Sequence, residues 1–177
     1  MSHRTRTASL LLLLLIGIGT IVVPMIPLAF AEPDRADWGA RIAEMDQALG
    51  RHDAAAAQSA WREAYVAAHV SRTWAGMLAV GDAALRAGRA TNAAELFEPR
   101  ARRAYLTALL RARRQGSLDG VLAAGEAFGR LGDKDVVKQA IAVATDLAER
   151  SGTVEARQRV QVFRSQWVVS GPVSPVL

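Results

Sequence analysis

The sequence predicts an all-α protein built from antiparallel helical hairpins that stack side by side. Two observations lead to this prediction. The composition is rich in alanine, leucine and arginine, with 51% hydrophobic and only 6% aromatic residues, which favours helix throughout. The chain also repeats itself, because LAVGDAALRAG at residues 78–88 returns as LAAGEAFGRLG at residues 122–132. The 177 residues suffice for one folded domain, and the repeat indicates that copies of one helical unit compose it.

The first element, residues 1–31, is predicted to be an export segment. It begins with basic residues, carries no charge from Ala8 onward and ends in Ala-Phe-Ala at Ala31. This order is typical of a secretory signal peptide that is cleaved after Ala31. The uncharged stretch is also long enough to remain as an uncleaved membrane anchor. We therefore expect residues 32–177 to be periplasmic or secreted after cleavage, or periplasmic and anchored to the inner membrane without it.

The folded domain is expected to span residues 32–167 and to begin with a helical hairpin. The sequence DWGARIAEMDQALGRHDAAAAQSAWREAY, residues 37–65, has two helical segments separated by a turn at residues 49–51. Trp61 and Trp74 fall at helical spacing, where aromatic side chains usually belong to the core. We expect both tryptophans to be buried between helices.

The two repeated stretches, residues 77–97 and 121–141, align at a constant offset of about 44 positions. Gly81 and Gly125 form one identical pair in this alignment and lie within predicted helices. Glycine inside a helix costs about 1 kcal/mol relative to alanine. The same cost at matching positions indicates that a neighbouring helix approaches too closely for a Cβ atom.

Helix boundaries in the two copies are predicted from turn and capping residues. Gly132 ends one helix and Asp133 caps the next, while Gly88 takes the corresponding turn position in the earlier copy. The extra length of the repeat lies between the copies, in residues 91–115, which Pro99 interrupts. This stretch is either one kinked helix, which we favour, or two helices of which the second starts at Pro99.

A last helix is predicted after Thr153, which is suited to cap its N-terminus. Its buried face consists of three apolar residues at helical spacing, Val160, Phe163 and Trp167. Such a helix would cover the last stacking face, which otherwise stays in contact with water. Residues 168–177 have no helical pattern and are expected to be a flexible tail.

In residues 37–150 the chain resembles the tetratricopeptide repeat family. The matching positions are Val121, Gly125, Phe128, Gly132, Val137, Ile141 and Ala144 in the later copy, and Met77, Val80, Gly81, Gly88, Ala93 and Phe97 in the earlier one. The period of 44 departs from the family's period of about 34, and most of its aromatic positions differ. The resemblance implies a short α-solenoid with a C-terminal capping helix, whose concave face binds a protein or peptide.

Carried over by position, five charged residues of the first helices are expected on that concave face and to contact the partner. They are Asp82, Arg86, Asp119, Glu126 and Arg130. Asp82 with Arg86, and Glu126 with Arg130, are also spaced as ion pairs within one helix, which stabilise a helix by about 0.2–0.5 kcal/mol. Both explanations of these residues stay open.

Four arginines, Arg100, Arg103, Arg111 and Arg114, share an arc of roughly 80° if their segment is helical. They form either a docking stripe for an anionic partner or a solvated face of an arginine-rich chain, and we favour the solvated face. The anionic partner in the first interpretation is a lipid head group, an acidic protein face or a carboxylated substrate.

Catalytic chemistry has little basis in the sequence. Cysteine is absent, no hydrolase, phosphate-loop or dinucleotide motif follows the export segment, and His52 and His69 lack metal-ligand spacing. We therefore expect no enzyme, no cofactor, no metal and, despite the net charge of +5, no nucleic-acid partner. The interpretation we favour is an exported protein-binding scaffold, or an assembly or maturation factor. The alternatives are a helical-bundle enzyme, a small-ligand carrier and a membrane-tethered structural spacer.

Overall fold

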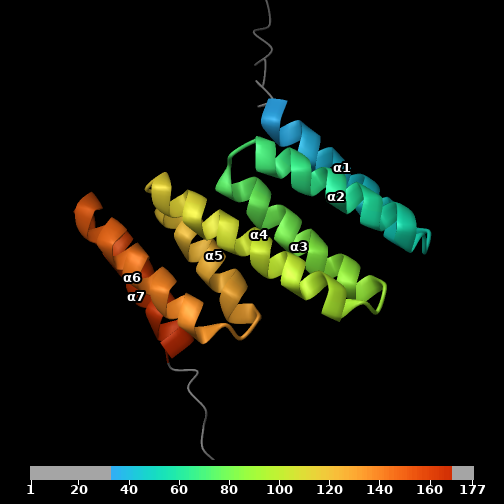
Figure 1. Cartoon of the computed structure of the whole chain (residues 1–177). Coiled ribbons are helices and arrows are strands. Elements are labelled where there is room, and N and C mark those ends of the chain that lie inside the picture. The colour runs from blue at the N-terminus through green and yellow to red at the C-terminus, as the bar shows by residue number, and fades with distance from the viewer. Residues whose placement is uncertain (1–32, 169–177) are drawn as a thin grey trace, which may run out of the picture.

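The computed structural model describes residues 33–168, and this part of the chain is all-helical, as predicted (Figure 1). Its seven helices are α1 (Pro33–Gly50), α2 (Ala54–Val70), α3 (Trp74–Ala90), α4 (Ala94–Arg114), α5 (Leu118–Arg130), α6 (Lys134–Ser151) and α7 (Val154–Val168). The predicted export segment and almost all of the predicted tail lie outside the described residues.

Each helix packs antiparallel against the next one, and the odd-numbered helices also pack against one another in sequence (Figure 1). These contacts join α1 to α3, α3 to α5 and α5 to α7. The even-numbered helices α2, α4 and α6 cover the odd-numbered row, so the core lies between two helical layers. Alanine supplies much of this core, which lets the helices approach closely.

A residue with a left-handed backbone recurs at every connection between the seven helices. In each connection one residue has a left-handed backbone, with φ between 52° and 78°; these residues are His52, Arg72, Asn92, Gly116, Gly132 and Gly152. In four turns the next backbone N–H donates to a carbonyl five residues earlier, as Asp133 does to Phe128 at 3.0 Å. This closure satisfies carbonyls at the helix end and sends the chain back antiparallel.

The turn at Gly132 is confirmed, but two other predicted turns are wrong. Gly88 is buried inside α3, which ends two residues later at Ala90, and the turn that follows is centred on Asn92. The turn predicted at residues 49–51 is centred on His52, because α1 continues through Gly50. A left-handed backbone is easiest for glycine, but Asn and His also adopt it, so glycine alone did not mark the turns.

The stretch around Pro99 is one continuous helix, α4, so the alternative of two helices is wrong. Asp133 is the N-cap residue of α6, as predicted, but its side chain makes no capping bond. Its Oδ2 instead accepts a hydrogen bond from Nε of Arg102 at 2.8 Å. The hydrogen bond to Asp133 raises the pKa of Arg102, and this pair ties α4 to the turn before α6.

The prediction about the paired glycines is confirmed. A Cβ atom at Gly81 would overlap the ring of Tyr105 on α4. A Cβ atom at Gly125 would lie 2.8 Å from Phe163 on α7 and 2.9 Å from Ala140 on α6. Real Cβ atoms do not approach other heavy atoms this closely. Both glycines therefore permit a close helix contact.

The predicted buried faces of the last helix and of the tryptophans are confirmed except at Trp167 and Trp74, which are half-buried. Val160 and Phe163 are buried and Trp167 is half-buried against Gly129, and Thr153 caps α7 by accepting from the N–H of Ala156 at 3.2 Å. Trp61 is buried as predicted, whereas Trp74 is half-buried. Its ring lies where a Cβ atom of Gly120 would be, so Trp74 joins α3 to α5.

Candidate binding surfaces

Ion pairs join each odd-numbered helix to the next odd-numbered helix. Most of the residues that were predicted for a concave face take part in these pairs. Arg86 on α3 pairs with Asp46 on α1 at 3.0 Å, and Arg130 on α5 pairs with Asp82 on α3 at 3.4 Å. Arg159 on α7 pairs with Asp119 on α5. All of these side chains are 41–68% exposed. The structure thus brings the predicted residues to one surface, which we call the odd-helix face.

Of the two predicted ion pairs within a helix, only one forms. Arg130 contacts Glu126 at 3.4 Å, whereas Asp82 and Arg86 each pair with another helix. Asp82 also accepts a 2.7 Å hydrogen bond from the hydroxyl of Tyr105, a fully buried side chain of α4. Burial raises the pKa of Tyr105, and the bond to Asp82 raises it further, so the phenol stays protonated and acts as the donor.

A groove of about 600 Å³ opens on the odd-helix face, between the C-terminal half of α3, the start of α4 and the end of α5. Its polar lining is Asp82, Arg86, Arg89, Glu98 and Arg130, and its apolar lining includes Leu85, Phe97 and Leu131. The groove has room because α5 has 13 residues and α3 has 17, so α5 ends about one helical turn earlier. Arg89 is exposed and forms no ion pair with any described residue.

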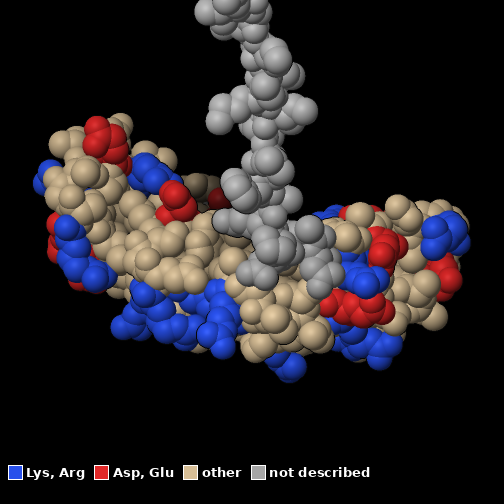
Figure 2. All heavy atoms as spheres, turned by 90° about the horizontal axis from the view of Figure 1, so that it is seen from above, with Lys and Arg blue, Asp and Glu red and all other residues tan. Residues whose placement is uncertain are grey.

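Lysine and arginine side chains also gather in the lower part of Figure 2. Arg111, one of the four arginines predicted to share a stripe, does not face solvent, because it is only 6% exposed. Its guanidinium donates to the carbonyls of Ala68, His69 and Thr73 at 2.9–3.1 Å. Burial lowers the pKa of Arg111. Its position shows a structural role, in which it ties α4 to the end of α2 and to the turn that follows.

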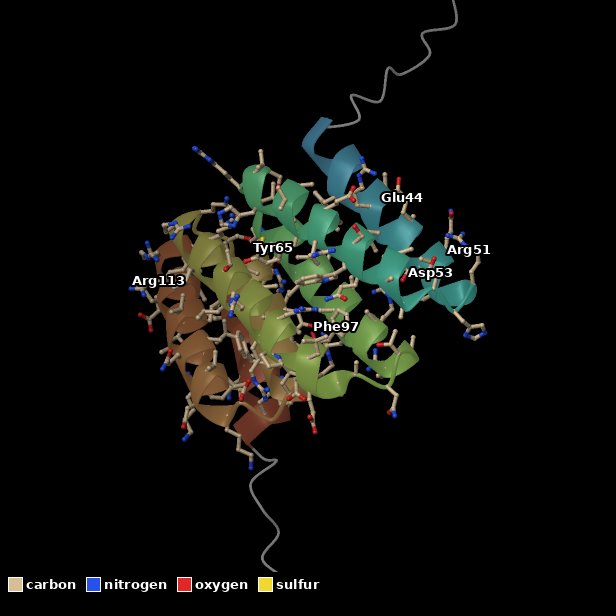
Figure 3. All side chains as sticks on the ribbon, turned by 45° about the vertical axis from the view of Figure 1, so that its right-hand side comes forward. Glu44, Arg51, Asp53, Tyr65, Phe97 and Arg113 are labelled. Atoms are coloured by element: carbon tan, nitrogen blue, oxygen red, sulfur yellow. The ribbon has the colours of Figure 1, made fainter. Side chains whose placement is uncertain are left out.

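Arg100 is also turned inward, so the four arginines form neither a docking stripe nor the solvated face that we favoured, and both interpretations are wrong. Its guanidinium lies over the rings of Trp61 and Phe97, at 5.4 and 5.0 Å from their centroids. Phe97, which is labelled in Figure 3, packs against Trp61 of α2 with their ring centroids 6.1 Å apart. Arg103 and Arg114 are exposed. Only these two of the four arginines are therefore fully open to a partner.

A second hollow, of about 740 Å³, lies between the C-terminal ends of α2 and α4, and we call it the α2–α4 hollow. Its lining residues are His69, Val70, Arg72, Thr107, Arg111, Arg114 and Gln115. Three arginines line it, and none of the lining residues is acidic. The sequence pattern of α4 could not identify this hollow, because Arg72 and His69 come from another part of the chain.

Among residues 33–168, no group of three His, Asp or Glu side chains is placed to hold a metal ion. No helix in the described part of the chain combines the length and hydropathy needed to cross a membrane. The chain matches no protein-family model, no curated protein and no solved structure.

Proposed function

We propose that residues 33–168 form a tetratricopeptide-like α-solenoid that binds an acidic segment of another protein in the groove between α3, α4 and α5. α7 serves as its capping helix. The export segment would deliver this scaffold to the periplasm, either released after Ala31 or held at the inner membrane, where it would act in assembly or maturation of its partner.

The proposed architecture is supported by the way the hairpins contact one another. The first helices of the pairs α1–α2, α3–α4 and α5–α6 contact one another in order, and α3 and α5 also pack against the second helix of the preceding pair. Contacts of both kinds fit the stacking of tetratricopeptide hairpins into a solenoid. The aromatic side chains of Trp38 and Trp74 fit against Gly76 and Gly120 of the following hairpin. Stacking of this kind leaves the face of the first helices open to a partner.

The proposed occupant follows from the chemistry of the groove, which is the observation that carries the proposal. Three arginines outnumber two carboxylates in its lining, and Arg89 has no acidic partner within the described residues. Leu85, Phe97 and Leu131 add apolar surface between the charges. An extended peptide with acidic side chains beside apolar ones would satisfy both parts of this lining.

A peptide-display library panned on the purified full chain tests the proposal. We expect enrichment of acidic peptides and about tenfold weaker binding of them, measured by fluorescence anisotropy, after Arg89→Glu. Arg62→Glu is the matched control, because Arg62 is also exposed and without an ion pair but lies on α2, away from the groove. Enrichment of no peptide, or equal weakening by both variants, would refute the groove as the binding site.

A further inference from the structure

The outer face of α4 exposes leucines and arginines together. Leu96, Leu106 and Leu110 are 48%, 47% and 44% exposed, and Arg103, Arg113 and Arg114 on the same face of the helix are also exposed. Figure 3 labels Arg113 at the outer side of this helix. None of the three arginines forms an ion pair with a described residue. Exposed leucines and unpaired arginines supply the two attractions that bind a helix to an anionic membrane surface, which are burial of apolar area and electrostatic attraction to the lipids.

The neighbouring end of α2 extends this surface. Val66 and Val70 are 61% and 71% exposed, and Val70 lines the α2–α4 hollow. Within the hollow, the nearby charges of Arg114 and Arg72 add to burial in lowering the pKa of Arg111. Three guanidinium groups therefore repel one another there without a carboxylate in the lining. A bound phosphate group would relieve this repulsion and accept hydrogen bonds from the guanidinium groups of Arg72 and Arg114.

The beginning of the folded domain lies at the same end of the molecule as the hollow. Trp38, in the first turns of α1, packs beside Gly76 and is next to Ala68 of α2. Arg111 of α4 donates to the carbonyl of that same Ala68. The uncharged stretch that begins at Ala8 ends at Ala31, two residues before Pro33, where α1 starts. A chain held in a membrane by that stretch would present this end of the domain to the lipid.

We propose that the ends of α2 and α4 dock on an anionic membrane, with phosphate head groups in the α2–α4 hollow. Leu110 and Val70 then contact the interfacial region, and Arg103, Arg113 and Arg114 contact neighbouring head groups. The interaction is independent of the peptide groove, which lies at the other end of α3. It places the domain on the membrane with the groove directed away from the lipid.

The absence of cysteine allows a direct test on the full chain. A polarity-sensitive fluorophore is attached at Leu110→Cys, or at Arg51→Cys in the α1–α2 turn as the control position, and the chain is reconstituted into vesicles. Vesicles with 30% phosphatidylglycerol are compared with pure phosphatidylcholine, each containing doxyl-labelled lipid as a quencher. We expect quenching at position 110 in the anionic vesicles only, weakened by raising the salt concentration, and none at position 51.

Charge-reversal variants test the role of the arginines. Arg72→Glu combined with Arg114→Glu should weaken docking, which is measured by the quenching at position 110. The equilibrium constant for docking should fall by about fivefold or more for each arginine removed. Arg89→Glu, in the peptide groove, should leave docking unchanged, so that each proposal can fail without the other. Circular dichroism checks that both variants fold.

Equal quenching at positions 110 and 51 in anionic vesicles would overturn the proposal. The proposal would also be overturned if the fluorophore at position 110 were shielded from water equally in both lipids and more strongly at higher protein density. A second copy of the chain would then cover this face. Full docking by the doubly reversed variant would show that the arginines do not recognise the lipid.

Discussion

Replacing Gly81 with alanine tests whether the repeated glycine exists to admit a neighbouring helix. In an open helical position, alanine stabilises by about 0.5–1 kcal/mol relative to glycine. At Gly81 the new Cβ atom would overlap the ring of Tyr105, which is fully buried and fixed by its hydrogen bond to Asp82. Overpacking of this kind costs about 1–3 kcal/mol, so we expect Gly81→Ala to lower the free energy of unfolding by about 1 kcal/mol.

Gly39→Ala is the matched control, because nothing lies within 4 Å of a Cβ atom at Gly39 in α1. Urea unfolding followed by circular dichroism should place the two variants about 2 kcal/mol apart, with Gly39→Ala the more stable. In a double-mutant cycle, Tyr105→Leu should recover about 1 kcal/mol of the loss at Gly81, because the shorter side chain leaves room for the methyl group. If Gly81→Ala is as stabilising as Gly39→Ala, the close-approach explanation of the repeat is wrong.

Two further predictions concern buried polar groups of α4. Arg111→Met should lower the free energy of unfolding, measured in urea, by about 3 kcal/mol, because three carbonyls in a buried site lose a charged donor. A loss below about 1 kcal/mol would show that water hydrates these carbonyls when the arginine is absent. Tyr105→Phe should cost about 1 kcal/mol at pH 8 through loss of the bond to Asp82. Because the folded pKa of Tyr105 is raised, its contribution is fully present below the unfolded pKa of about 10 and is lost as pH rises above it. Above pH 10, the free energy of unfolding of the wild-type chain should therefore fall by up to about 1.4 kcal/mol per pH unit more than that of Tyr105→Phe. Equal losses in the two proteins would contradict this assignment.

The local features of the fold were predictable because they depend on spacing along one helix. The left-handed residue Gly132, the cap at Thr153 and the buried face of α7 all follow from signals within a few residues of each other. Gly88 was misplaced because the offset of 44 applies only to the beginnings of α3 and α5. α5 ends about one turn earlier than α3 does, so identical residues at that offset take different positions at the helix ends.

The candidate surfaces were less predictable because they depend on which helix lies opposite. The arc shared by the four arginines of α4 crosses the edge where that helix meets α2. Arg103 and Arg114 fall on the solvent side of the edge, whereas Arg111 falls on the buried side. Asp82 likewise had a partner of correct spacing in Arg86, but the adjacent α5 offered Arg130. Such choices are made by tertiary contacts, which one sequence does not reveal.

The lengths of α4 and α5 have a consequence for the shape of the protein. α4 has 21 residues and α5 has 13, so together they equal two helices of 17, the length of both α2 and α3. Four residues advance a helix by about 6 Å and turn it only about 40° beyond a full revolution, so lengthening one helix and shortening the next barely rotates their apolar sides. The connecting loop is displaced along the axis while its conformation is preserved. Adding four residues to the end of α5 would therefore close the peptide groove without redesigning the core, which makes groove depth an adjustable dimension of this architecture.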